Sequence, residues 1–178
     1  MRRDGDRIRA AREREREAAL KAAEEEERER EKQQEGARRE KRKQNREAWR
    51  RWARRALVPA EPTTEPSVRV TVRIASGQRR TRMFPASAPV EAIYAFVETL
   101  SIPSDQSPEQ DPESPPAEYV HEWGFVLATT FPRVVVPCEE GTRVGDVEVL
   151  RGGVVLVVEG GGEDEDEEEE DDEDEDEE

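Results

Sequence analysis

Apolar and polar residues follow two different patterns along this chain, and the boundary between them lies near residue 66. Beyond it, every second residue from Val68 to Ile74 is apolar, and the residues between them are arginine or threonine. This alternation is typical of a strand with one buried face. Ser76-Gly77 supplies a turn, and Arg79 to Phe84 is the returning strand. The pattern predicts a β-hairpin.

The returning strand contains one conflict between pattern and chemistry. Parity with Phe84 places Arg80 and Arg82 on the apolar face. Either a bulge shifts the register, or the aliphatic stems of these arginines pack while their guanidinium groups reach solvent.

The chain after the hairpin predicts a helix, an insertion and further strands. Ser87-Ala88-Pro89 is typical of a helix start, with Ser87 or Ala88 near the cap, and helical apolar spacing follows from Val90 to Leu100. Residues 101–118 are rich in proline, serine and acid, which predicts a surface loop or a disordered insertion. The last predicted elements are strands at Tyr119–Thr130, Val134–Val136 and Gly153–Glu159, with a short helical turn within Thr142–Leu150.

The order of these elements is ββαββ, a short helical turn and a final strand. A helix that follows the first hairpin and is wrapped by a small mixed sheet is the ubiquitin-like β-grasp, so we expect the α+β class. Roughly 75 residues outside the insertion are enough for one small core.

The part of the chain before residue 58 has few apolar positions. Residues 7–57 contain no proline and one glycine, Gly36, and are dominated by Ala, Glu, Arg, Lys and Gln. They predict a helix of about 50 residues, roughly 75 Å long. Between residues 24 and 47 the one apolar side chain is Ala37, so no continuous apolar seam exists. A solvated single helix or weak coiled coil is favoured over a tight dimer.

The last turns of this helix differ from the rest. Their apolar residues fall on one helical face, which we interpret as packing against the following domain. The alternative is an independent contact with a partner or a membrane. The intervening arginines are candidates for nucleic-acid contact, although basic runs on a helix are more often solvated. The apolar residues are Trp49, Trp52, Ala53 and Ala56, and the arginines are Arg50, Arg51, Arg54 and Arg55.

Charge divides the chain into unlike segments. Residues 1–55 carry 21 Lys and Arg against 14 Asp and Glu, whereas residues 159–178 carry 17 acidic residues and no basic one. A surface of one globular domain would not separate charge so strongly, and an acidic run of this kind is typical of disorder. The predicted organisation is a long charged helix at 1–57, a proline-rich linker at 58–66, a ubiquitin-like domain at 67–159 with the acidic insertion 101–118, and a disordered acidic tail at 160–178.

The sequence also bears on the cellular compartment. A single cysteine, Cys138, excludes an internal disulfide and suits a reducing compartment. The charged N-terminus lacks the apolar region of a signal peptide, and no run approaches the ~18 apolar residues of a membrane span. We expect a cytoplasmic or nuclear protein. The opening Met1-Arg2-Arg3-Asp4 is typical of a cut into a charged helix, so a fragment of a longer protein is a further expectation.

Residues that could carry catalysis are sparse. His121 is the one histidine and Cys138 the one thiol, and no nucleophile–base motif surrounds either. We interpret His121 as a sheet-surface residue and Cys138 as a small buried hydrophobe. The sequence has no phosphate-binding glycine loop and no metal-ligand spacing. We therefore expect a non-catalytic protein with no cofactor or metal.

The tripeptide Phe131-Pro132-Arg133 lies between the apolar runs Phe125–Thr130 and Val134–Val136. Proline is rare inside a sheet because it cannot donate to the ladder, so the tripeptide predicts a tight turn. Such a turn exposes an aromatic ring beside a planar cation. Aromatic and arginine side chains dominate the energetics of protein interfaces, which makes this turn the candidate binding site.

With these motifs the chain resembles the UBX domain family. The family signature is an arginine on the first strand and a Phe-Pro-Arg turn between the third and fourth strands. The matching residues are Arg73 and Gly77 on the first hairpin, Phe84 at the end of the second strand, and Thr130-Phe131-Pro132-Arg133. The charged helix resembles that of the FAS-associated factor branch. The long acidic insertion and Arg80 depart from the family pattern.

The resemblance implies a partner and a role for each signature residue. The partner is the N-terminal domain of the hexameric AAA ATPase valosin-containing protein. Phe131 would insert into the hydrophobic cleft of that domain. Pro132, cis in many family members, would hold the turn, and Arg133 and Arg73 would make charged hydrogen bonds at the rim of the cleft.

The resemblance also implies a cellular role. The chain would be a non-catalytic adaptor that recruits the ATPase to ubiquitin-dependent degradation, for example at the cytosolic face of the endoplasmic reticulum in a longer parent protein. Ubiquitylated substrates would be bound only through regions absent from these residues.

Two other classes of function stay open at this point. Gly160-Gly161-Gly162 follows the last predicted strand, as in a ubiquitin-like modifier precursor. The acidic tail suits a charge-driven scaffold that binds basic partners or the chain's own arginine-rich helix, and the basic helix suits nucleic acid, which we do not expect as a partner.

Overall fold

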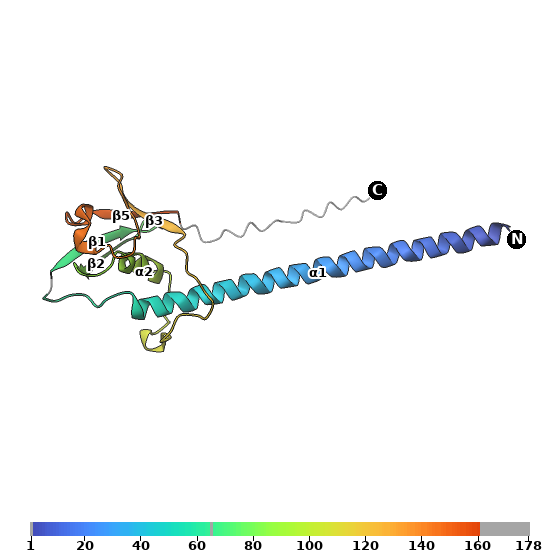
Figure 1. The fold of residues 1–178 in the computed structure, drawn as a ribbon, viewed down its shortest axis with the longest axis horizontal. Coiled ribbons are helices and arrows are strands. Elements are labelled where there is room, and N and C mark those ends of the chain that lie inside the picture. Colours follow the sequence, from blue (N-terminus) through green and yellow to red (C-terminus); the bar gives the residue numbers. More distant parts are fainter. Residues whose placement is uncertain (1, 65, 161–178) are drawn as a thin grey trace. The chain divides into compact units, whose positions relative to one another are not determined.

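The structure is a computed structural model that describes residues 2–64 and 66–160 (Figure 1). The chain divides into two compact units, one ending at Glu47 and the other beginning at Ala48. Helix α1 (Arg2–Ala56) supplies the first unit and the opening turns of the second. Apart from Gly160, the predicted acidic tail lies outside the described residues.

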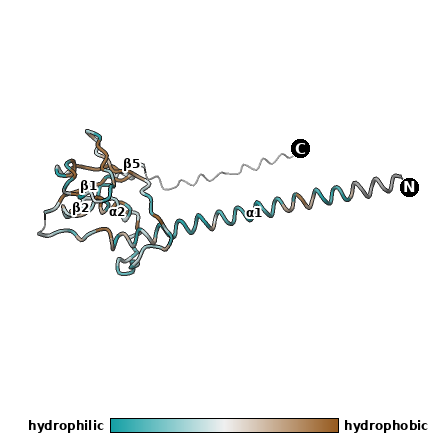
Figure 2. Tube along the Cα trace, in the orientation of Figure 1, coloured by the Kyte–Doolittle hydropathy of each residue, from teal (hydrophilic) through white to brown (hydrophobic). Residues whose placement is uncertain are grey.

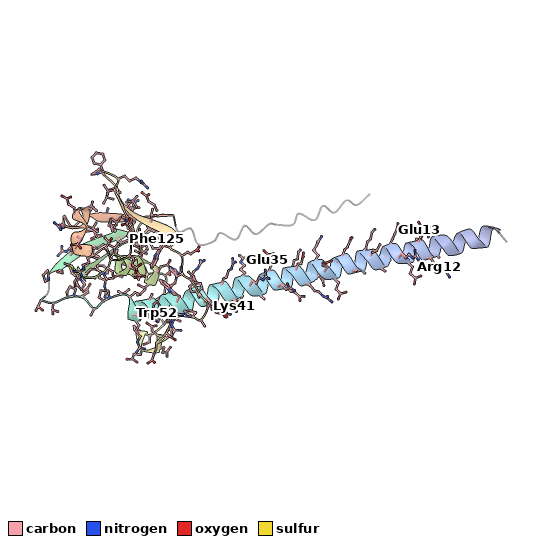
Figure 3. The ribbon with its side chains drawn as sticks, viewed as in Figure 1. Arg12, Glu13, Glu35, Lys41, Trp52 and Phe125 are labelled. Atoms are coloured by element: carbon pink, nitrogen blue, oxygen red, sulfur yellow. The ribbon has the colours of Figure 1, made fainter. Side chains whose placement is uncertain are left out.

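The first unit is a solvated helix. Every side chain from Ala11 to Gln44 is exposed, and polar residues run along α1 in Figure 2. Glu26 accepts a hydrogen bond from Arg30 at 2.5 Å, one turn further along the helix. The predicted long helix is therefore confirmed, whereas the preference for a solvated single helix or weak coiled coil over a tight dimer stays a prediction. Figure 3 labels four of the charged side chains that project from it, Arg12, Glu13, Glu35 and Lys41.

The second unit contains a five-stranded mixed sheet with one helix, α2, against a face (Figure 1). The strand order is β2-β1-β5-β3-β4, in which β1 and β5 run parallel and the other neighbours antiparallel. This arrangement confirms the predicted ubiquitin-like β-grasp. The bounds are Ser67–Arg73 for β1, Arg79–Pro85 for β2, Glu91–Thr99 for α2, Phe125–Thr129 for β3, Val135–Val136 for β4 and Val155–Gly160 for β5.

The first hairpin forms as predicted. Gly77 has φ of 80°, a conformation that L side chains rarely adopt, and it closes the turn. The β1–β2 register is unbroken, so no bulge shifts Arg82 off the apolar face. Instead its guanidinium lies over the ring of Phe96, 5.5 Å from the ring centre, and Nη2 donates to the Pro59 carbonyl at 2.7 Å. Arg80 is exposed.

The core lies between the sheet and α2. Tyr94 of α2 joins the two layers, because its hydroxyl donates to the Val136 carbonyl at 2.7 Å and accepts from the Leu127 amide at 3.2 Å. These two hydrogen bonds connect α2 to both β3 and β4. The largest other side chains that are almost fully buried are Phe84, Ile93, Leu127, Leu150, Leu156, Val70, Val72, Val90, Val136 and Val144.

The start of α2 differs from the prediction. The helix begins at Glu91 after Val90, and no side chain caps it, so neither Ser87 nor Ala88 is the cap. Backbone hydrogen bonds to the loop around Thr142 and Val144 hold this segment instead. The Val90 amide donates to the Thr142 carbonyl at 2.9 Å, and the Ala88 carbonyl accepts from the Val144 amide at 2.8 Å.

The predicted strand Tyr119–Thr130 is too long, since β3 begins at Phe125. The aromatic residues before it pack on α1 and α2 instead of pairing with a strand. The other strands lie close to their predicted positions. The predicted helical turn consists of two short 3-10 helices, η2 (Val144–Asp146) and η3 (Glu148–Leu150).

The last turns of α1 pack onto the rest of the second unit, which confirms the preferred interpretation of their apolar face. Trp49 and Ala53 are buried and form a cluster with Ala95 of α2. Ala56 is exposed, contrary to the prediction, because the helix ends there. The prediction that His121 is a sheet-surface residue is also wrong. Its side chain is only 6% exposed and stacks on Trp49.

The arginines of this segment are bound to carboxylates and are not simply solvated. Arg50 Nε lies 2.7 Å from Glu98 Oε2. Arg54 donates to both carboxylate oxygens of Asp111, from Nε at 2.7 Å and from Nη2 at 2.6 Å. Arg51 Nε lies 3.4 Å from the same carboxylate.

The predicted insertion is consequently an ordered part of the unit. Asp111 is 4% exposed, and the 3-10 helix η1 (Pro108–Gln110) immediately precedes it. Disorder was therefore the wrong alternative for this segment. Because carboxylates of the insertion and of α2 occupy the arginines, the basic run is held inside the unit.

Candidate docking surface

The Phe131-Pro132-Arg133 turn connects β3 to β4 and exposes its aromatic ring. Phe131 is 95% exposed, and the Phe131–Pro132 peptide bond is cis. The ring is therefore almost unburied and contributes little to the stability of the fold. A large apolar side chain presented in this way is a candidate anchor for a partner's pocket.

Thr129 holds the base of the turn. Its hydroxyl donates to the Pro132 carbonyl and accepts from the Val134 amide at 2.9 Å, while its own amide donates to the Val134 carbonyl at 2.9 Å. Thr129 is 2% exposed, so solvent does not compete for these bonds. The exposed ring thus stands on a closed hydrogen-bonded loop.

Arg133 is paired within the chain. Its Nη2 lies 2.6 Å from Glu159 Oε2, and its Nε lies 3.2 Å from each carboxylate oxygen. Hydrogen bonding to Arg133 lowers the pKa of Glu159, and the same bonding raises the pKa of Arg133. Both groups therefore stay charged over a wide pH range.

Arg73 lies on the same outward face of the sheet, two strands away from β3. It pairs in register with Val157 of β5, which pairs with Ala128 of β3. Core-facing Val72 precedes it, and Arg73 itself is exposed. Neighbouring strands are about 4.8 Å apart, which places the Arg73 and Ala128 backbones about 10 Å apart. The structure thus brings Arg73 onto the face of the turn but not into the turn itself.

The outward face near the turn is apolar. Val126 and Val134 are each 40% exposed, and Val135 is 37% exposed. With Phe131 they form a candidate docking surface, whose charged members are Arg133 and Arg73, and which is called the docking surface from here on. A mixed apolar and guanidinium surface suits a protein partner rather than a small substrate.

Sequence reasoning missed Thr129 and Glu159. A threonine two residues before Phe131 carries a weak signal, because its hydroxyl can bond to a nearby backbone in a turn. Glu159 carries none, because its proximity to Arg133 depends on the pairing of β5 with β3, which brings together residues far apart in the chain.

Reactive or metal-ligating side chains do not form a second candidate site in the described part of the chain. Cys138 is partly buried against the core, and burial raises the pKa of its thiol. Within residues 2–64 and 66–160, no group of three or more His, Cys, Asp and Glu side chains is placed to hold a metal ion. No helix there combines the length and the apolar character that crossing a bilayer requires.

The mixed sheet with α2 against one face defines a ubiquitin-like domain. The profile of the UBX domain family matches residues 62–159, which is more than half of the chain. The chain belongs to the UBX domain family. UBX domains in general act as adaptors of the AAA ATPase valosin-containing protein and bind its N domain. The resemblance to the FAS-associated factor branch stays a proposal.

Two known proteins show the extent of the similarity. The UBX domain-containing protein 10 of Schizosaccharomyces pombe is 29% identical over 95 residues, which cover 49% of this chain and 22% of that protein. The chain thus spans about a fifth of this relative's length. The solution structure of the UBX domain of D0H8S2298E protein is 22% identical, with a TM-score of 0.42 over 58% of this chain and 80% of that one.

Proposed function

We propose that this chain is a non-catalytic adaptor that docks on the N domain of a valosin-containing-protein-type AAA ATPase through its Phe-Pro-Arg turn. The observation that carries the proposal is Phe131, whose ring is 95% exposed on a turn closed by Thr129. Pro132 shapes the turn, and Arg133 and Arg73 supply the polar contacts around the apolar cleft of the partner.

The adaptor role extends to protein degradation. We propose that the chain recruits the ATPase to ubiquitin-dependent degradation, for example at the endoplasmic reticulum, and that other regions of a longer parent protein hold the substrate. A cytoplasmic or nuclear location belongs to the same proposal.

Two alternatives receive less support. Gly160 pairs with Phe125 inside the sheet, so the first of the three glycines is not a free stalk for conjugation. The arginines at the end of α1 are paired with Glu98 and Asp111, which leaves less positive charge for nucleic acid.

Titration of the full chain against the isolated N domain tests the proposal. Phe131→Ala removes the anchor, and we expect about 30-fold weaker binding, since a central aromatic contributes about 2 kcal/mol or more. Val120→Ala is the matched control, because Val120 is 82% exposed and lies outside the docking surface. Equal affinity of Phe131→Ala and the unmodified chain would overturn the proposed site.

A further inference from the structure

The pair formed by Arg133 and Glu159 crosses a strand. Arg133 is the last residue of the turn, on the β4 side, Glu159 belongs to β5, and β3 lies between β4 and β5. Glu159 pairs in register with Val126, which is 40% exposed, so the carboxylate lies on the outward face. The arginine side chain must therefore pass over β3 on the docking surface.

Ala128 lies at the middle of this path. Its register partners, Val135 in β4 and Val157 in β5, share the outward row with Arg73. Ala128 is nevertheless fully buried. A methyl group at this position is small enough to leave room for a long side chain above it. The Arg133 side chain thus reaches Glu159 across β3 while 59% of it stays exposed.

The pairing uses one edge of the guanidinium. Nε and Nη2 face the Glu159 carboxylate, so the two hydrogens of Nη1 and one of Nη2 are free for a partner. Glu159 also neutralises the charge of Arg133. A carboxylate on a partner would meet the repulsion of Glu159, whereas a backbone carbonyl or a hydroxyl oxygen would not.

We propose that Glu159 is a positioning residue of the docking surface, which fixes Arg133 before binding and directs it to uncharged oxygen acceptors on the partner. The proposal rests on the proposed function, in which Arg133 contacts the N domain. Ordering a long side chain normally costs affinity, and a group that orders it in the free protein removes that cost.

Glu159→Gln in the full chain tests this role. We expect about fivefold weaker binding to the isolated N domain, from the lost order of Arg133. Glu148→Gln makes the same change of charge at an exposed glutamate of η3 and should bind like the unmodified chain. In an Arg133→Ala background, Glu159→Gln should have no further effect, because its influence passes through Arg133.

Salt dependence tests the predicted acceptor. The comparison is made in Glu159→Gln, because the exposed pair of Arg133 with Glu159 is itself screened by salt. In that background, the ratio of affinities between the chain with Arg133 and the chain with Arg133→Ala should be the same at about 50 mM and about 300 mM NaCl if the acceptors are uncharged. A ratio that falls with salt would overturn this part of the proposal.

The remaining outcomes separate the two proposals. Binding of Glu159→Gln that is unchanged or tighter, while Arg133→Ala binds weakly, would overturn the positioning role and leave the docking site intact. An equal loss from Glu159→Gln with and without Arg133 would also overturn it. Full binding by both Phe131→Ala and Arg133→Ala would instead overturn the proposed function. Circular dichroism of each variant confirms that the fold is kept.

Discussion

Trp49 and His121 stack face to face, with ring centroids 3.5 Å apart and ring planes 5° apart. Trp49 belongs to the last turns of α1, and His121 to the segment before β3. Trp123 meets both rings edge-on, at 5.4 Å from Trp49 and 4.7 Å from His121. This aromatic cluster fastens the end of α1 to the ubiquitin-like domain.

Trp49→Ala should destabilise the second unit by about 3–5 kcal/mol, because it removes a ring that is 6% exposed and leaves a cavity beside His121. Urea unfolding followed by circular dichroism measures the change. Leu20→Ala is the control, since Leu20 is 65% exposed on α1 and should change stability by less than about 0.5 kcal/mol. Equal midpoints for Trp49→Ala and Leu20→Ala would contradict the buried cluster.

Stability should fall as the solution becomes acidic. Burial alone would raise the pKa of Glu98, but hydrogen bonds and charges from His121 and Arg50 outweigh it and lower the pKa. Hydrogen bonding to Arg54 likewise lowers the pKa of Asp111. A carboxyl whose pKa is lower in the folded state stabilises fully above its unfolded pKa, and this contribution is lost as the pH falls through the folded value.

We therefore expect the free energy of unfolding to decrease from about pH 5 downward. Urea titrations at a series of pH values measure the slope. Glu98→Gln should be less stable than the unmodified chain at pH 7 and should lose less stability on acidification. A slope that is the same in both proteins would show that Glu98 does not contribute to it.

Asp111→Asn should release the insertion from α1. The substitution removes the charge that binds Arg54 and Arg51 in a site where the Asp111 side chain is 1% exposed, and loss of one partner of a buried pair costs about 3–5 kcal/mol. Hydrogen exchange should rise in residues 101–118, with little change in β1. Asp105→Asn is the control, because Asp105 is exposed. Unchanged hydrogen exchange in the insertion would contradict a stabilising role for the pairing of Asp111 with Arg54 and Arg51.

Local patterns in the sequence were sufficient for the elements that depend on local chemistry. Alternation from Val68 to Ile74 predicts β1, Gly77 predicts the turn, and the Phe-Pro-Arg motif predicts an exposed aromatic. Long-range pairing was not predictable in the same way. A strand's own sequence does not specify which residue of a distant strand lies opposite, so the approach of Glu159 to Arg133 could not be read from either segment.

The same reason explains the errors around α1. Arg54 and Asp111 are 57 residues apart, and each is typical of a solvated charge when considered alone. His121 lies in a run of extended character, which favours a strand. In the structure His121 stacks instead on Trp49, which lies far away in the sequence and is not specified by that run.

Thr129→Val should weaken both the turn and the docking site. The substitution keeps the shape of the side chain but removes the hydroxyl that bonds to Pro132 and Val134, which leaves the Val134 amide without its side-chain acceptor. We expect a loss of about 1–3 kcal/mol in stability and weaker binding to the N domain. Thr129→Ser keeps the hydroxyl and should recover most of the binding. If Thr129→Val has the same stability and the same affinity for the N domain as the unmodified chain, the hydroxyl does not support the turn.

Two glycines should respond in opposite ways to alanine. A Cβ at Gly145 would lie 2.9 Å from both the Cβ and the carbonyl oxygen of Ala86, and the Gly145 amide already donates to that carbonyl. Gly145→Ala should therefore force the backbones apart and cost about 1–3 kcal/mol. A Cβ at Gly36 meets nothing within 4 Å, so Gly36→Ala should favour the α1 helix by about 1 kcal/mol. Thermal unfolding of the domain and the helical dichroism of α1 separate the two effects. A domain that tolerates Gly145→Ala without loss would contradict the close approach of η2 to Ala86.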